Sequence, residues 1–186
     1  MVKLRAKCIL AGNAAVGKTA LVQMFLSDGA HFQKNYSMSA GVEVVVKTVS
    51  IPDSSDSVEL FIFDSAGREV FLESCEKLWA QASVLCVVFD VTSELSFTRC
   101  AYWLDRVRQH CQDPQAPGVL VGNKVDLEER REVEAGVARD WAQSQGLEYF
   151  ETSAKEMQSF ELPFLGLAQT FHRVYQDRVQ ALRTLA

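Results

Sequence analysis

Long hydrophobic runs, paired cysteines and excess positive charge are all scarce in this sequence. No apolar run approaches the ~20 residues of a membrane-spanning helix, and no charged segment followed by an apolar stretch opens the chain, so we expect a cytosolic protein. The five cysteines are scattered and form no C-x-x-C pair, which favours a reducing compartment over a disulfide framework. The net charge is −5 and no Lys/Arg cluster occurs, which argues against a surface that binds nucleic acid.

The chain is long enough for one domain with a sizeable core. Its 186 residues are 48% hydrophobic, and repeats, low-complexity tracts and linkers are absent from the sequence. We therefore expect a single domain over residues 1–186.

Apolar strand-like runs alternate with amphipathic helical ones along the chain. Two β-rich runs flank a Pro-Asp-Ser-Ser-Asp turn and predict an antiparallel hairpin, and the later alternation predicts parallel strands crossed over by helices. Strands are expected at 6–11, 41–50, 57–64, 83–90, 118–123 and 147–152. Helices are expected at 18–26, 69–80, 93–110, 132–145 and 159–186, with Pro163 tolerated in the first turn of the last one.

Residues 12–19, GNAAVGKT, fit the phosphate-binding pattern G-x-x-x-x-G-K-[ST]. A strand precedes them and a helix follows, as that pattern requires. Gly12 and Gly17 let consecutive backbone N–H groups approach a phosphate closely. Lys18 supplies a charge for the outer phosphates, and the Thr19 hydroxyl can ligate Mg²⁺. This stretch predicts a bound nucleoside triphosphate.

A second stretch, FIFDSAG, delivers Asp64 to the carboxyl end of an apolar strand. A carboxylate there can hold Mg²⁺ opposite Thr19, and the Gly67 N–H can approach a γ-phosphate because no side chain intervenes. Taken alone, an Asp at the end of a strand is more often a turn residue or a helix cap; the phosphate-binding loop makes the metal role the better interpretation.

Two further segments are expected to recognise the base of the nucleotide: NKVD, at 123–126, and ETSAK, at 151–155. A carboxylate at Asp126 accepts two hydrogen bonds from N1–H and the 2-amino group of guanine, a donor pair that adenine lacks. Lys124 would lie along the base, Ser153 would brace Asp126, and the Ala154 N–H would donate to guanine O6. All these stretches end strands at the edge where open α/β sheets bind ligands.

With these motifs the chain resembles the Ras-like small GTPases, and the Rab branch most closely. The resemblance implies a P-loop α/β three-layer sandwich with a six-stranded, mostly parallel sheet, one antiparallel strand and five helices, binding GTP or GDP with Mg²⁺. It implies metal ligation by Thr19, Ser39 and Asp64. It implies nucleotide contacts by Gly12, Ala15, Val16, Gly17, Lys18, Thr19, Ala20, Phe32, Ser39, Gly67, Asn123, Lys124, Asp126, Ser153, Ala154 and Lys155.

Arg68 departs from the family pattern. It follows Asp64-Ser65-Ala66-Gly67, where the family carries a glutamine that orients the attacking water. A guanidinium cannot accept a hydrogen bond from that water, so no residue is assigned as catalytic, and we expect hydrolysis at or below a family rate on the order of 10⁻⁴ s⁻¹. Arg68 is either solvated or partner-facing or, as the less favoured alternative, a built-in arginine finger.

The C-terminal part carries no lipidation cysteine, since the last cysteine is Cys111. Together with residues 27–34, this resembles the Rab-like small GTPases of the intraflagellar transport complex. The resemblance implies a small β-sandwich partner subunit, an outer train complex and a place in the cilium or flagellum and at its base through partners. The apolar end of the last helix is either a partner surface or a frayed terminus.

Two functions remain open from the sequence. A GTP-dependent switch would order residues 30–40 and 67–74 around the γ-phosphate, and Ser39 and Gly67 favour it. A structural adaptor would hold a nucleotide that stabilises the fold without cycling, and Arg68 and the absent anchor favour that. Trp79, Trp103 and Trp141 are expected to pack against the sheet.

Overall fold

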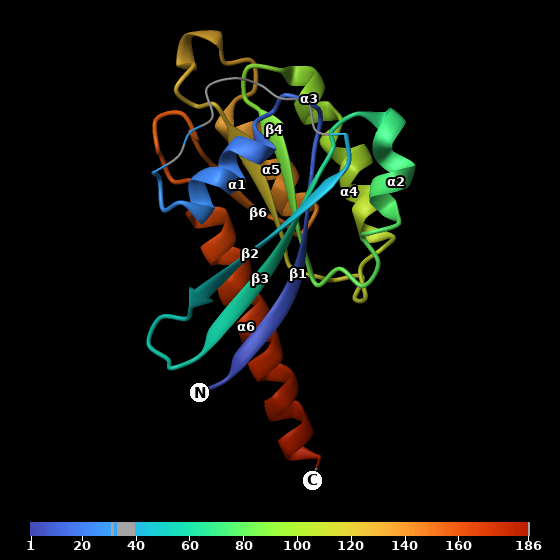
Figure 1. Cartoon of the computed structure of the whole chain (residues 1–186), viewed down its shortest axis with the longest axis vertical. Coiled ribbons are helices and arrows are strands. Elements are labelled where there is room, and N and C mark those ends of the chain that lie inside the picture. Colours follow the sequence, from blue (N-terminus) through green and yellow to red (C-terminus); the bar gives the residue numbers. More distant parts are fainter. Residues whose placement is uncertain (31, 33–39, 186) are drawn as a thin grey trace.

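A computed structural model of the chain describes residues 1–30, 32 and 40–185. At its centre is a sheet with the strand order β2-β3-β1-β4-β5-β6 (Figure 1). The hairpin of β2 and β3 is antiparallel, whereas the other neighbouring strands pair in parallel. The strands are β1 (Lys3–Ala11), β2 (Val42–Ser50), β3 (Ser57–Ser65), β4 (Val84–Asp90), β5 (Gly118–Asn123) and β6 (Glu148–Glu151). The predicted sheet, with its single antiparallel strand, is confirmed.

The helices within the described residues are α1 (Lys18–Leu26), α2 (Leu72–Glu76), α3 (Glu94–Thr98), α4 (Cys100–Arg108), α5 (Ala135–Ser144) and α6 (Leu162–Thr184). Only Arg99 separates α3 from α4, so this pair corresponds to one predicted helix. The predicted helix over 69–80 is wrong in its extent. A 3-10 turn precedes α2, and beyond Glu76 the backbone bonds from Leu78 and Trp79 reach back three residues, because the Trp79 ring turns into the core.

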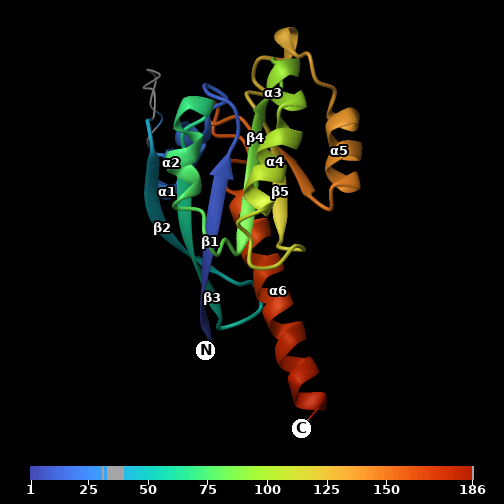
Figure 2. The same cartoon turned by 90° about the vertical axis from the view of Figure 1, so that its right-hand side faces the viewer.

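Each face of the sheet buries its own apolar cluster. Along β1, Cys8 and Leu10 belong to one cluster and Ile9 and Ala11 to the other, as the two-residue period of a strand requires. The first cluster includes side chains of α1 and α6, and the second includes side chains of α2, α4 and α5 (Figure 2). The fold is therefore the three-layer sandwich that the resemblance implies.

α6 extends past the end of the sheet (Figures 1 and 2). Its first half is buried through Phe164, Leu167 and Ala168, and Pro163 lies in the first turn as expected. Its last turns leave Leu182 67% exposed, and Leu185, which follows the helix, is 85% exposed. Within the described part of the chain, no helix combines the length and the apolar character needed to cross a membrane.

Candidate functional site

The predicted motifs meet at one edge of the sheet, because β1, β3, β4, β5 and β6 run parallel and end there. The strand order places the loop after β3 on one side of the loop after β1. It places the loops after β5 and β6 on the other side. A ligand bound along this edge would therefore meet the predicted metal residues first, then the phosphate loop, then the predicted base residues.

The phosphate loop connects β1 to α1, which begins at Lys18. Gly17 precedes the helix with φ 98°, and no side chain caps the helix or places an acidic group in its first turn. A Cβ atom on Gly17 would lie 2.3 Å from Nδ2 of Asn123, so glycine is required by space as well as by conformation. The uncapped N–H groups at the start of α1 are suited to an anion.

Lys18 is buried beneath the loop. Its Nζ donates to the Gly12 carbonyl at 2.9 Å and to the Asn13 carbonyl at 2.8 Å. Burial lowers the pKa of Lys18 to about 8, against the opposing effect of Asp64. A phosphate beside this ammonium group would favour its charged form.

Thr19 and Asp64 face each other at the predicted metal position. The Thr19 hydroxyl donates to Oδ2 of Asp64 at 2.6 Å. The other oxygen, Oδ1, is buried without a hydrogen-bond partner among the described residues, and burial raises the pKa of Asp64 against the effects of Thr19 and Lys18. An orphaned carboxylate oxygen beside a hydroxyl fits Mg²⁺, which prefers oxygen ligands. Ser39, the third predicted ligand, lies outside the described residues.

A cavity of about 250 Å³ opens on the β5 side of the phosphate loop. Leu127, which the sequence analysis did not single out, lines it together with eight predicted nucleotide-binding residues: Gly17, Ala20, Phe32, Asn123, Lys124, Asp126, Ala154 and Lys155. Asp126 is oriented there by Ser153, whose hydroxyl donates to its Oδ1 at 2.7 Å. This arrangement gives the cavity a positioned carboxylate.

Asn123 connects the phosphate loop to the two segments that are predicted to bind the base. Its Nδ2 donates to the Val16 carbonyl at 3.0 Å, and its Oδ1 accepts from the Thr152 hydroxyl at 3.0 Å. The Ala154 N–H also points to Oδ1, at the longer distance of 3.4 Å. The phosphate loop and the two predicted base-reading segments are therefore held together through one side chain.

Lys124 makes a second connection to the phosphate loop. Its Nζ donates to the Ala15 carbonyl at 2.7 Å and pairs with Asp90 at 2.7 Å. Sequence reasoning missed Asp90, although it ends the apolar strand β4 just as Asp64 closes the apolar run of β3. An Asp at the end of an apolar strand is therefore a sequence feature from which Asp90 could have been predicted as a site residue.

Arg131 was also missed. It donates two hydrogen bonds to Glu151, at 2.9 and 3.0 Å, and the Tyr149 hydroxyl donates to the same carboxylate at 2.7 Å. Burial acts to raise the pKa of Glu151, but the bonds from Arg131 and Tyr149 outweigh it and hold that pKa below its usual range. The Arg131–Glu151 ion pair connects the segment after β5 to the end of β6. No spacing rule in the sequence predicts this pair.

Arg68 is exposed, and its side chain makes no hydrogen bond or ion pair with any other residue that the structure describes, although its carbonyl accepts from the Phe71 N–H at 3.0 Å. Its neighbour Glu69 pairs instead with Arg99, between α3 and α4. The Arg68 side chain is thus not held over the phosphate loop, which favours the solvated or partner-facing alternative.

This chain belongs to the Ras family, whose sequence model matches residues 7–173. Members of that family bind guanine nucleotides together with Mg²⁺, and the fit of Thr19, Asp64 and the cavity residues agrees with this.

Among its relatives is the intraflagellar transport protein 27 homolog of Homo sapiens, 59% identical over 100% of both chains. Intraflagellar transport protein 27 of Chlamydomonas reinhardtii is 42% identical over 97% of this chain and 90% of its own length. Ras-related protein Rab-30 of Homo sapiens is 40% identical over 87% of this chain and 77% of its own.

Proposed function

We propose that residues 1–186 act as one GTP-binding domain that holds GTP or GDP with Mg²⁺ along the described edge. The observation that carries this proposal is the placement of Asp126. Ser153 orients its carboxylate at the cavity, while Asn123 and Lys124 tie the same segment to the phosphate loop. A guanine base in the cavity would bring N1–H and its 2-amino group to that carboxylate.

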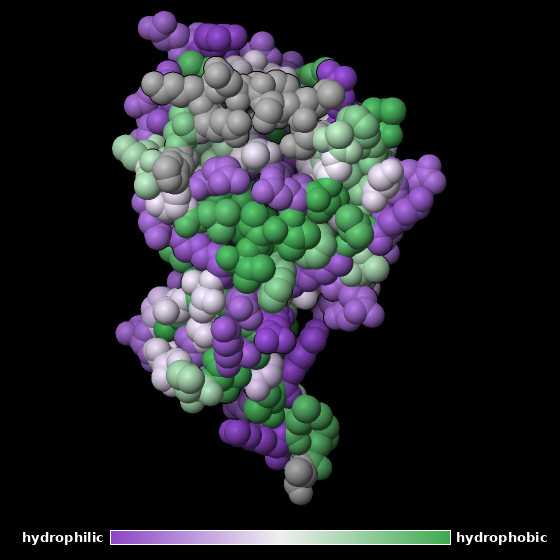
Figure 3. Space-filling view, in the orientation of Figure 1, coloured by the Kyte–Doolittle hydropathy of each residue, from purple (hydrophilic) through white to green (hydrophobic). Residues whose placement is uncertain are grey.

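The names of the relatives support a role as a small GTPase of intraflagellar transport, acting in the cilium or flagellum. Within that role we propose that the protein binds its protein partners in a GTP-dependent manner. Apolar side chains gather over β2 and β3 (Figure 3), where Val44 is 48% and Val46 46% exposed. Because β3 contains Asp64 and leads directly to Gly67, a partner bound there would respond to the terminal phosphate.

Slow hydrolysis is part of the same proposal. The exposed Arg68 offers no acceptor for an attacking water, so the GTP state would persist until an activating partner acted. The loop at 12–19 would serve mainly to hold GTP.

A structural adaptor is the second candidate, favoured by the exposed apolar end of α6 with Leu182 and Leu185. In that function the nucleotide stabilises the fold without cycling, and the partners stay bound. The resemblance implies a small β-sandwich subunit and the outer train complex as these partners.

Nucleotide-deficient variants distinguish the two functions. Lys18→Ala and Thr19→Asn would be compared with the wild type and with Lys3→Ala, a control at an exposed lysine far from the site. Bound nucleotide is quantified after denaturation, and affinity for purified intraflagellar transport subunits is measured in parallel. We expect both properties to fall in the two variants only. Unchanged partner affinity in a folded, nucleotide-free variant would establish the adaptor, and a wild type with no affinity for guanine nucleotides would overturn the proposal.

A further inference from the structure

Two buried tryptophans donate hydrogen bonds to the two segments that lie at the phosphate end of the site. Nε1 of Trp103, on α4, donates to Oδ1 of Asn13 in the phosphate loop at 2.7 Å. Nε1 of Trp79, which follows α2, donates to the Ser65 hydroxyl at the end of β3 at 2.9 Å. Their rings are 1% and 0% exposed, so each indole N–H needs a partner within the protein.

The two segments also contact each other. The Ala14 N–H donates to the Gly67 carbonyl at 3.1 Å, and a Cβ atom on Gly67 would lie only 2.3 Å from the Ala14 nitrogen. The Asn13 carbonyl accepts from Lys18 Nζ at 2.8 Å. A shift of Asn13 would therefore move both the lysine ammonium and the junction with Gly67.

Packing by itself does not require an indole N–H at these two positions, because a phenylalanine ring would also fill apolar space on this face of the sheet. Both donate to polar side chains that flank the junction. The acceptor of Trp103 lies next to Ala14, and the acceptor of Trp79 lies two residues before Gly67. Asp126 and Ser153, on the β5 and β6 side of the site, are bonded to neither indole.

We propose that Trp103 and Trp79 are positioning residues that hold the Ala14–Gly67 junction, and that this junction determines how strongly the chain prefers GTP to GDP. The proposal rests on the proposed function, since it concerns the γ-phosphate of the same nucleotide. Loss of either indole hydrogen bond leaves the base side intact and loosens the backbone that faces the terminal phosphate.

The test compares Trp103→Phe, Asn13→Ala, Trp79→Phe and Ser65→Ala with the wild type. Trp141→Phe is the matched control, because Trp141 packs against Phe97 at 5.8 Å and its indole makes no hydrogen bond to a described residue. Dissociation constants are measured with Mg²⁺ for GDP and for a non-hydrolysable GTP analogue. Thermal unfolding of each nucleotide-free variant shows whether it remains folded.

We expect the preference for the GTP analogue over GDP to fall about three- to tenfold in the four variants, the range for loss of one buried hydrogen bond, and to stay unchanged in the control. The double variant Trp103→Phe/Asn13→Ala should lose no more than either single change, because both remove the same bond. Asn13→Ala alters an accessible loop side chain, so it keeps the test decisive if a tryptophan variant fails to fold.

An unchanged preference in folded Asn13→Ala, or additive losses in the double variant, would overturn the positioning role while leaving the proposed function standing. A wild type that binds neither nucleotide would reject the proposed function itself. Equal losses of GDP and GTP affinity would show a general structural effect and would also overturn the inference.

Discussion

In the proposed function, base selectivity depends on Asp126, whose carboxylate is oriented at the cavity by Ser153. We predict that Asp126→Asn loses GTP affinity about 10²-fold or more, since an amide presents a donor where guanine also presents one. The same variant should gain affinity for xanthosine triphosphate, whose 2-oxo group accepts from that amide. Competition binding with both nucleotides measures this, with the exposed Asp140→Asn as control. Unaltered GTP affinity would refute the assignment.

At the same scale, we predict that Arg68 limits the rate of hydrolysis. Replacing it with Gln restores an amide that accepts a hydrogen bond from water, so Arg68→Gln should raise the single-turnover rate several-fold above a wild-type rate on the order of 10⁻⁴ s⁻¹ or less. Radiolabelled GTP in a single-turnover assay measures the change, and Arg130→Gln controls for loss of an exposed positive charge. If the rate stays the same, another feature of the site limits hydrolysis.

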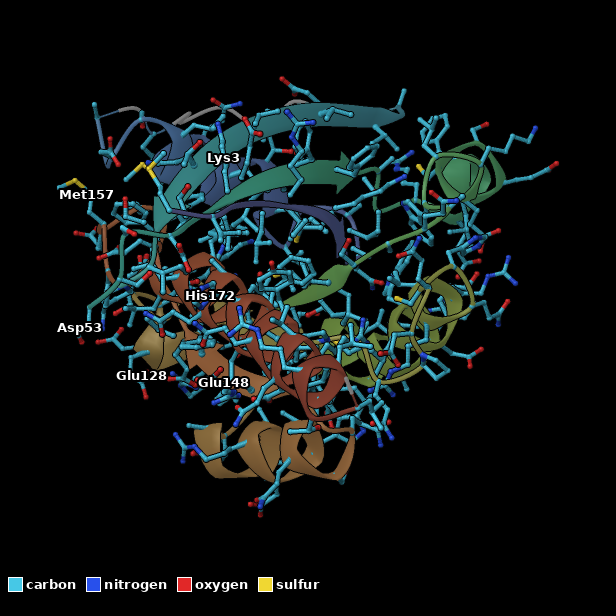
Figure 4. All side chains as sticks on the ribbon, turned by 90° about the horizontal axis from the view of Figure 1, so that it is seen from below. Lys3, Asp53, Glu128, Glu148, Met157 and His172 are labelled. Carbon is cyan, nitrogen blue, oxygen red and sulfur yellow. The ribbon has the colours of Figure 1, made fainter. Side chains whose placement is uncertain are left out.

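At the scale of elements, α6 is joined to the turn between β2 and β3. His172, on α6 in Figure 4, hydrogen-bonds Oδ2 of Asp56 at 2.9 Å, and the Val2 N–H donates to Oδ1 at 2.7 Å. The bond from His172 holds the pKa of Asp56 below its usual value of 3.8, assisted by the bond from Val2. A lowered pKa stabilises the fold above the ordinary value of the carboxyl group and ceases to do so as the pH falls through the lowered value.

We therefore predict that Asp56→Asn is less stable than the wild type at pH 7 and that the difference shrinks below about pH 4. Urea unfolding midpoints at pH 7, 5, 4 and 3 measure the difference. Asp53→Asn, in the same turn and labelled in Figure 4, is the control because its carboxyl group is exposed. A constant difference across this pH range would mean that the Asp56 charge is not what joins α6 to the turn.

The whole molecule should be stabilised by a bound nucleotide, because the loops that form the site follow most of the strands of the sheet. GTP with Mg²⁺ at 100 times its dissociation constant should add about 2.7 kcal/mol to the free energy of unfolding. For a chain of this size that corresponds to about 5–10 °C in Tm. Thermal unfolding with GTP, ATP or no nucleotide measures this, and removal of Mg²⁺ by a chelator should reduce the gain. Equal stabilisation by ATP would contradict guanine selectivity.

Much of the site was predictable because its chemistry is local. The helix at Lys18–Leu26 and the strand at Gly118–Asn123 begin and end where their apolar periods predict. Asp64 and Asp126 could be predicted as site residues because each follows an apolar run within a short motif. Helix ends were predicted less well, and the helix that closes at Glu76 ends early because a tertiary contact pulls Trp79 into the core.

The order of the motifs, the alternation of strands and helices and the placement of functional groups at strand ends are determined by the sequence alone, since each depends on residues near one another in the chain. Only the tertiary structure decides which distant side chains meet. Trp103 reaches Asn13 across 90 positions, and Arg131 meets Glu151 across 20. Such pairs are set by how helices pack on the sheet, and the packing of α4 is what brings an indole N–H to the phosphate loop.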